Sequence, residues 1–94
     1  MTSLRALATA APLLLAAASP ALAQSFCYVS DPTGTPLNIR IEPGGRVVGA
    51  IRNGTQVTIS DSRVDHTGRL WVFIRGLDDN RGIGWVYRNF LNCA

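Results

Sequence analysis

Side chains that could carry out catalysis are few in this 94-residue chain. A Ser-His-Asp triad needs a histidine that a carboxylate orients against a hydroxyl, and His66, the only histidine, lies beside Asp65 in the polar segment 62–68. A solvated loop histidine is the better interpretation. Glu42 and Asp61 could form the acid pair of a glycosidase, but so small a domain lacks a sugar-distorting cleft around them. We therefore predict that the protein is not an enzyme and holds no cofactor or metal.

Trp71 is a stronger candidate, and its chemistry would be binding. It lies in the run 70–75, which is dense in residues that favour β-strands. Successive strand residues point to opposite faces, so Val72 and Ile74 would share the core face and Trp71 would point away from it. An outward tryptophan can line a ligand groove or pack over one end of the domain, and both interpretations stay open here. Trp85 lies next to a core position, and packing is the better interpretation for it.

Arginine carries all the positive charge, because the chain contains no lysine and has a formal net charge of +3. The arginines after residue 23 are spread along the sequence and never cluster. A nucleic-acid-binding protein would concentrate them in a stripe, so we predict no nucleic-acid partner. Arg40 could hold a ligand carboxylate through two parallel hydrogen bonds. It could equally form an internal ion pair with Asp31 or Glu42.

The first 23 residues predict a cleaved signal peptide. Arg5 is their only charge, residues 6–18 are apolar, and Ala21-Leu22-Ala23 is the small-x-small pattern that signal peptidase accepts. A membrane anchor needs about 20 apolar residues, whereas this stretch is shorter and holds Pro12. We expect cleavage before Gln24, and a periplasmic or secreted protein without a membrane span in its mature form.

Export in turn explains the two cysteines, Cys27 and Cys93. In an oxidising compartment an even number of cysteines predicts a disulfide, and two cysteines allow one pairing. Their spacing is not the Cys-x-x-Cys of a redox pair, and the chain offers too few further ligands for a metal site. The predicted bridge closes a loop of 66 residues. On the chain-entropy model such a loop stabilises a domain by about 4 kcal/mol.

No helical periodicity appears after residue 23; short β-branched runs alternate with Gly, Pro, Asn and Asp, which is typical of an all-β domain. Asn53-Gly54 is the strongest hairpin signal, because this pair suits a type I′ turn. A short 3-10 turn is expected at 89–91. We predict one domain, residues 24–94, folded as a small barrel of five to six short antiparallel strands, with strands expected at 26–29, 37–41, 47–52, 55–60, 70–75 and 83–87.

Three patterns along this domain resemble the bacterial SH3 domain family (SH3b). The first is Leu37-Asn38-Ile39-Arg40 followed by Pro43, and the second is the segment 48–57 with its Gly-Thr pair. The third is Trp71-Val72-Phe73-Ile74 and Gly84-Trp85-Val86, closing on Phe90-Leu91. Their order and spacing span about residues 27–93. The resemblance implies an SH3-like barrel ending in a 3-10 turn that binds a ligand without catalysis.

The resemblance also implies which residues bind. Trp71 falls at the groove tryptophan of the eukaryotic relatives, Tyr87 at their groove proline and Phe90 at their groove tyrosine. Asn38 and Arg40 replace their first groove aromatics, a change that disfavours a polyproline helix as ligand. Several bacterial members bind cell-wall peptidoglycan or envelope proteins. We therefore expect a binding face made of these five residues, with one of those two partners.

A second hypothesis belongs to a different class of protein. The domain would be an interaction subunit or inhibitor that docks on an exported enzyme through a sheet edge or a loop. Under either hypothesis we expect the domain to be a monomer. A pull-down on purified peptidoglycan sacculi would distinguish the two hypotheses, because only the first predicts binding there.

Overall fold

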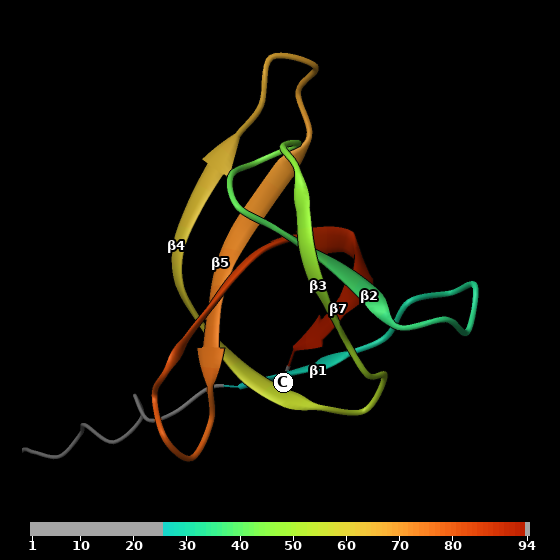
Figure 1. Cartoon of the computed structure of the whole chain (residues 1–94), viewed down its shortest axis with the longest axis vertical. Coiled ribbons are helices and arrows are strands. Elements are labelled where there is room, and N and C mark those ends of the chain that lie inside the picture. The colour runs from blue at the N-terminus through green and yellow to red at the C-terminus, as the bar shows by residue number, and fades with distance from the viewer. Residues whose placement is uncertain (1–25, 94) are drawn as a thin grey trace, which may run out of the picture.

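The computed structural model describes residues 26–93 (Figure 1). The predicted signal peptide, residues 1–23, lies outside this part of the chain. The prediction of an all-β domain is confirmed, but the strands number seven instead of five or six. A 3-10 turn precedes the last of them. In chain order the elements are β1 (Cys27–Val29), β2 (Leu37–Arg40), β3 (Val47–Ile51), β4 (Gln56–Val64), β5 (Leu70–Gly76), β6 (Gly82–Tyr87), η2 (Arg88–Phe90) and β7 (Leu91–Cys93).

All seven strands belong to one antiparallel sheet with the order β3-β2-β6-β5-β4-β1-β7. β3 and β7 are its two edges, and no ladder joins them within residues 26–93, so the sheet is not a closed barrel. β4 is bent, as Figure 1 shows, and its register with β5 shifts between Ile59 and Asp61. The bend lets one long strand pair with β1 at its start and with β5 along its length.

No helix among the described residues is long and apolar enough to cross a membrane.

β7 is the strand that sequence patterns missed. It is only three residues long. Its partner β1 lies at the other end of the sequence of the domain, and the pairing places Cys93 directly opposite Cys27. Pairing at that sequence distance leaves no local pattern. The predicted disulfide between these two cysteines is confirmed, and it fastens β1 to β7.

The expected loop at 62–68 is shorter than predicted. Residues 62–64 continue β4, and the ladder to β5 runs as far as the pair Val64 and Leu70. The side chains of 62–64 are exposed, which is why their composition resembles a loop. Backbone pairing with β5, and not side-chain type, extends the strand here.

The hairpin predicted at Asn53-Gly54 is wrong. β3 pairs with β2 whereas β4 pairs with β1 and β5, so the two flanking strands form no ladder. Gly54 has a φ of 88° but Asn53 has no positive φ, and the amide of Thr55 donates to the carbonyl of Arg52 at 3.2 Å. These features define a type II turn in place of type I′.

The side chain of Asn53 has a separate structural role. Its Oδ1 accepts a hydrogen bond from the amide of Asp31 at 2.6 Å, and its Nδ2 donates to the carbonyl of Thr35 at 3.1 Å. These two bonds fix the loop between β1 and β2 at both of its ends. The asparagine is therefore explained by a distant loop, and not by the turn in which it lies.

The core lies on the inner face of the sheet. Val72 and Ile74 are buried there, as their strand parity predicted, and they pack with a cluster contributed by most of the strands. The other buried members of this cluster are Cys27, Val29, Leu37, Ile39, Val57, Val86 and Leu91. The chain thus builds one apolar core from short strands far apart in sequence.

Gly84 allows β2 to cross closely over β6. Its φ is 149°, and a Cβ placed on it would lie 2.5 Å from Cγ2 of Ile39 and 3.2 Å from the carbonyl oxygen of Arg40. Arg40 pairs with Trp85 at this crossing. The absence of a side chain at Gly84 therefore decides how near Arg40 comes to the aromatic residues of β5 and β6.

Candidate binding cleft

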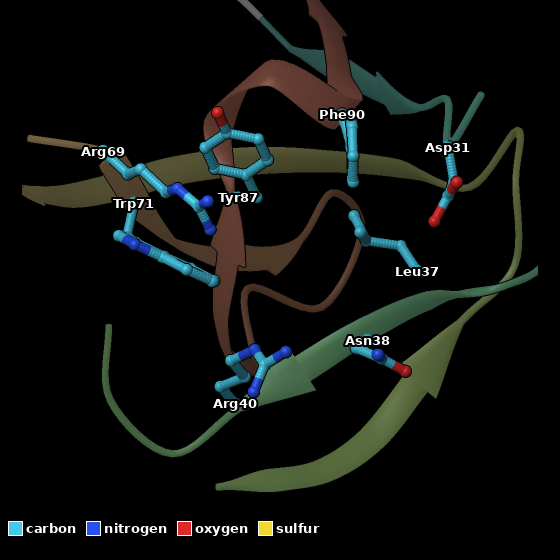
Figure 2. Close-up of a pocket in the computed structure, with 8 residues that line it drawn as sticks. All are labelled: Asp31, Leu37, Asn38, Arg40, Arg69, Trp71, Tyr87 and Phe90. Atoms are coloured by element: carbon cyan, nitrogen blue, oxygen red, sulfur yellow. The ribbon is translucent and has the colours of Figure 1, made fainter. Parts of the chain in front are cut away.

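An open cleft of about 340 Å³ lies between β2 and the β5–β6 pair (Figure 2). All five residues predicted to bind a ligand line it, although they come from three separate strands and the 3-10 turn. Three residues that sequence reasoning did not assign to binding complete the lining. The full set is Asp31, Leu37, Asn38, Arg40, Arg69, Trp71, Tyr87 and Phe90.

Aromatic rings form the wall of the cleft. Trp71 lies opposite Tyr87 in the β5–β6 ladder, with ring centroids 5.6 Å apart. Phe90 meets Tyr87 edge-to-face at 5.1 Å, a favourable arrangement for two aromatic rings. Trp71 is only 6% exposed, so it packs against its neighbours and lines the cleft at the same time. Trp71 is therefore a packed side chain at the edge of a hollow, and its contact with a ligand stays a prediction.

Asp65 fixes the orientation of the indole. The Trp71 Nε1 donates to its Oδ2 at 2.8 Å, while its Oδ1 accepts hydrogen bonds from the Thr67 hydroxyl at 2.6 Å and the Thr67 amide at 2.8 Å. The Thr67 hydroxyl, and next the Trp71 indole, hold the pKa of Asp65 well below its ordinary value. Asp65 is therefore a structural carboxylate that positions Trp71. The Asp-x-Thr spacing, typical of an Asx turn, is the signal that could have revealed this role.

Two guanidinium groups lie over the aromatic wall. Cζ of Arg40 is 5.6 Å from the Trp71 ring centroid, and Cζ of Arg69 is 5.9 Å from that of Tyr87. Arg40 Nη1 also donates to the carbonyl of Gly45 at 2.7 Å. Sequence reasoning identified Arg40 but missed Arg69, because its position over Tyr87 depends on how β5 pairs with β6. These contacts make one end of the cleft cationic.

The other end of the cleft is acidic. Figure 2 shows Asp31 beside Leu37 and Phe90, away from the two arginines. Asp31 opens a turn in which its Oδ1 accepts hydrogen bonds from the Thr33 amide at 2.9 Å and the Thr33 hydroxyl at 2.7 Å. The turn itself was predicted from sequence. The position of its carboxylate at the cleft was not, because the Asn53 contacts that fix this loop are long-range.

Arginine covers aromatic rings elsewhere on the same face of the sheet. Arg63 lies 5.1 Å over the Trp85 ring, and Arg75 lies 5.6 Å over that of Phe73. Trp85 is 7% exposed, which agrees with the packing role predicted for it. An arginine on an aromatic ring therefore does not by itself identify a site in this protein. The hollow between β2 and the β5–β6 pair distinguishes the cleft from the rest of the face.

The remaining candidates for chemistry do not converge. His66 is exposed in the loop between β4 and β5, and within residues 26–93 no three His, Cys, Asp or Glu side chains gather as a metal ion would require.

Comparison of the chain with models of known protein families, with characterised proteins and with solved structures finds no match. The physical features of the cleft therefore carry the functional argument.

Proposed function

We propose that this protein is an exported, non-catalytic binding module of SH3b type, and that its ligand lies in the cleft. One observation carries the proposal: Trp71, Tyr87, Phe90, Asn38 and Arg40 line a single hollow. The resemblance to SH3b domains supports peptidoglycan or an envelope protein as the ligand. The disulfide is compatible with function in an oxidising compartment such as the periplasm or the extracellular space.

The chemistry of the lining favours peptidoglycan. Aromatic rings offer a large contact area at low entropic cost and stack on sugar rings or on flat peptide groups. The guanidinium groups of Arg40 and Arg69 present fixed forks of N–H donors that suit a carboxylate. Peptidoglycan combines sugars with peptides that carry carboxylates, so one ligand would engage both kinds of group.

Co-sedimentation of the purified, oxidised protein with peptidoglycan sacculi tests the proposal. Arg69→Ala removes an exposed side chain at the cleft, and we expect about tenfold weaker binding, as for the loss of one charge-assisted hydrogen bond. Arg81→Ala removes an equally charged, exposed side chain at the β5–β6 turn and should bind as the native protein does. Circular dichroism must show both variants folded. Equal binding by the two variants would overturn the assignment of the cleft.

Trp71→Phe tests the aromatic wall with the least damage to packing. Alanine would leave a void beneath Arg40, since the indole is buried. Phenylalanine keeps a ring opposite Tyr87 but loses the hydrogen bond to Asp65. We expect the variant to fold and to bind sacculi more weakly. Native affinity in a folded Trp71→Phe protein would show that the indole does not contact the ligand.

One observation favours the second hypothesis, an inhibitor or interaction subunit docking on an exported enzyme. β3 is an edge of the sheet, and Val47 and Val48 on it are 43% and 49% exposed. Such an edge can accept a strand from another protein. Val48→Lys would block that pairing and leave binding to sacculi unchanged if the cleft is the site. Under the second hypothesis the native protein would not bind sacculi. Capture of an exported enzyme by the native protein and by Arg69→Ala, but not by Val48→Lys, would instead favour the edge.

A further inference from the structure

The cleft carries opposite charges at its two ends, with apolar surface between them. Figure 2 shows Arg40 and Arg69 with Trp71 at one end and Asp31 at the other. The rings of Tyr87 and Phe90 and the side chain of Leu37 occupy the lining between them. A neutral saccharide would engage neither charged end, and a polyanion would be repelled by Asp31. The charge arrangement therefore matches a ligand that is itself dipolar.

The cationic end keeps hydrogen-bond donors for a ligand. A guanidinium that stacks on a ring presents its face to that ring, so its N–H groups point outward from the edge. Arg69 is exposed, and its Cζ lies 5.9 Å from the Tyr87 ring centroid, a distance at which its N–H groups can still reach a ligand. Arg40 uses Nη1 for the carbonyl of Gly45, and within the described residues 26–93 its other nitrogens donate no hydrogen bond and can meet a carboxylate.

The acidic end is held in place before any ligand arrives. Both Thr33 hydrogen bonds go to Oδ1 of Asp31, and the amide of Asp31 is bound by the Asn53 side chain. Among residues 26–93, Oδ2 of Asp31 has no hydrogen-bond partner. A carboxylate fixed in this manner loses little conformational entropy when it binds an ammonium group. Its position at the cleft therefore suits a cationic ligand group.

We propose that the cleft selects a peptide segment bearing a free carboxylate and a free primary amine on neighbouring residues, with the carboxylate at Arg40 and Arg69 and the ammonium at Asp31. The inference rests on the proposed function, because it concerns the same cleft. In peptidoglycan the stem peptide offers this pair of groups as a glutamate carboxylate followed by the side-chain amine of a diamino acid. Cross-linking converts that amine to an amide. The module would accordingly prefer un-cross-linked stem peptides.

Titration with synthetic tripeptides tests the inference. The probe is N-acetyl-alanyl-γ-glutamyl-diaminopimelate, whose side-chain amine and carboxylates are free, and two analogues carry either an acetylated side-chain amine or an amidated glutamate carboxylate. We expect each analogue to bind about tenfold more weakly, as for one charge-assisted contact. Binding is followed by chemical shift changes of the Trp71 indole N–H, which reports on the cleft directly.

The variant Asp31→Asn assigns the ammonium contact. Asparagine keeps an Oδ1 that accepts the Thr33 hydrogen bonds, so the loop is retained while the charge is lost. Asp31→Asn should weaken binding of the free-amine peptide and leave binding of the acetylated peptide unchanged, a coupling that a purely structural role would not produce. Asp78→Asn, an exposed carboxylate at the β5–β6 turn, is the matched control and should bind both peptides as the native protein does.

The possible failures are distinguishable. If the free and acetylated peptides bind equally, or if Asp31→Asn weakens both alike, the dipolar inference is overturned while binding in the cleft stands. If the amidated peptide binds as tightly as the free one, the carboxylate contact is overturned. If no peptide shifts the Trp71 indole and sacculi are not bound, the proposed function itself fails.

Discussion

The two faces of the β5–β6 pair are built from alternate residues of the same strands, yet they are covered in different ways. On the inner face Val72, Ile74 and Val86 are 2%, 0% and 0% exposed and pack against aliphatic neighbours. On the outer face the rings of Trp71 and Trp85 are almost as well covered, but partly by the guanidinium groups of arginines. Aliphatic side chains cover the inner face, whereas arginine side chains over aromatic rings cover part of the outer face.

The difference shows how a small domain can keep polar groups accessible on one face and remain stable. An aliphatic core loses contact energy whenever an atom is removed, because nothing fills the gap. An arginine over a ring contributes less, but it keeps its N–H donors accessible. The outer face can therefore exchange contacts with a ligand at little expense to the fold.

The largest effect is expected from the inner face. Ile74→Ala removes a fully buried side chain at the centre of the core and should lower the free energy of unfolding by about 2–5 kcal/mol. Urea denaturation with the disulfide intact measures it. A loss below about 1 kcal/mol would show that the core relaxes around the cavity. The inner and outer faces would then contribute more similarly to stability than their burial indicates.

Gly84→Ala tests the close crossing of β2 over β6. The new methyl group would meet Ile39 and the carbonyl of Arg40, and the backbone would be held at a φ of 149°. We expect a loss of about 1–3 kcal/mol and weaker ligand binding, because Arg40 is displaced. Gly49→Ala is the matched control, since its methyl group would lie at an ordinary 3.8 Å from Ile39. Similar stability of the two variants would contradict this account of the crossing.

Arg63→Ala probes the outer face away from the cleft. It uncovers the Trp85 ring, and we expect a loss of about 0.5–1 kcal/mol, the size of an exposed cation–π contact. Arg52→Ala, which removes an exposed arginine from the turn before β4, should change the unfolding free energy less. A loss in Arg63→Ala as large as that in Ile74→Ala would remove the distinction between the faces.

The smallest effect concerns the pH dependence of stability. The hydrogen bonds to Thr67 and Trp71 lower the pKa of Asp65 in the folded state, so the unfolded chain binds a proton there first on acidification. The stabilisation is complete above the unfolded pKa of about 3.9 and is lost as the pH falls through the folded value. Melting temperatures between pH 6 and 2 should therefore fall less steeply for Asp65→Asn. Parallel curves would contradict the role of this carboxylate.

Local periodicity was sufficient to predict the parts of the fold that depend on neighbouring residues. Strand parity placed Val72 and Ile74 in the core, and the turn chemistry of Asp31 was visible in its sequence. Compartment and cysteine number predicted the pairing of Cys27 with Cys93. Two of the positions that failed depend on long-range contacts. β7 exists only through β1, and Asn53-Gly54 serves a loop about 20 residues earlier.

The residues of the candidate site also divide into those that the sequence predicted and those that it missed. Family resemblance proposed five residues that the structure brings to one cleft, and their role in binding stays a prediction. Arg69 and Asp31 were missed, because nothing in their sequence neighbourhoods indicates a shared hollow. Arg69 reaches it through the β5–β6 register, and Asp31 reaches it through the Asn53 side chain.

The disulfide between the first and last strands also determines how the domain carries mechanical load. A pulling force on the two ends of residues 26–93 would pass from β1 through the bond between Cys27 and Cys93 into β7. The segment between these cysteines, residues 28–92, holds every residue of the cleft and lies outside that path. A covalent bond and not the backbone ladder would bear the tension. The cleft would keep its shape while the chain that carries it is stretched.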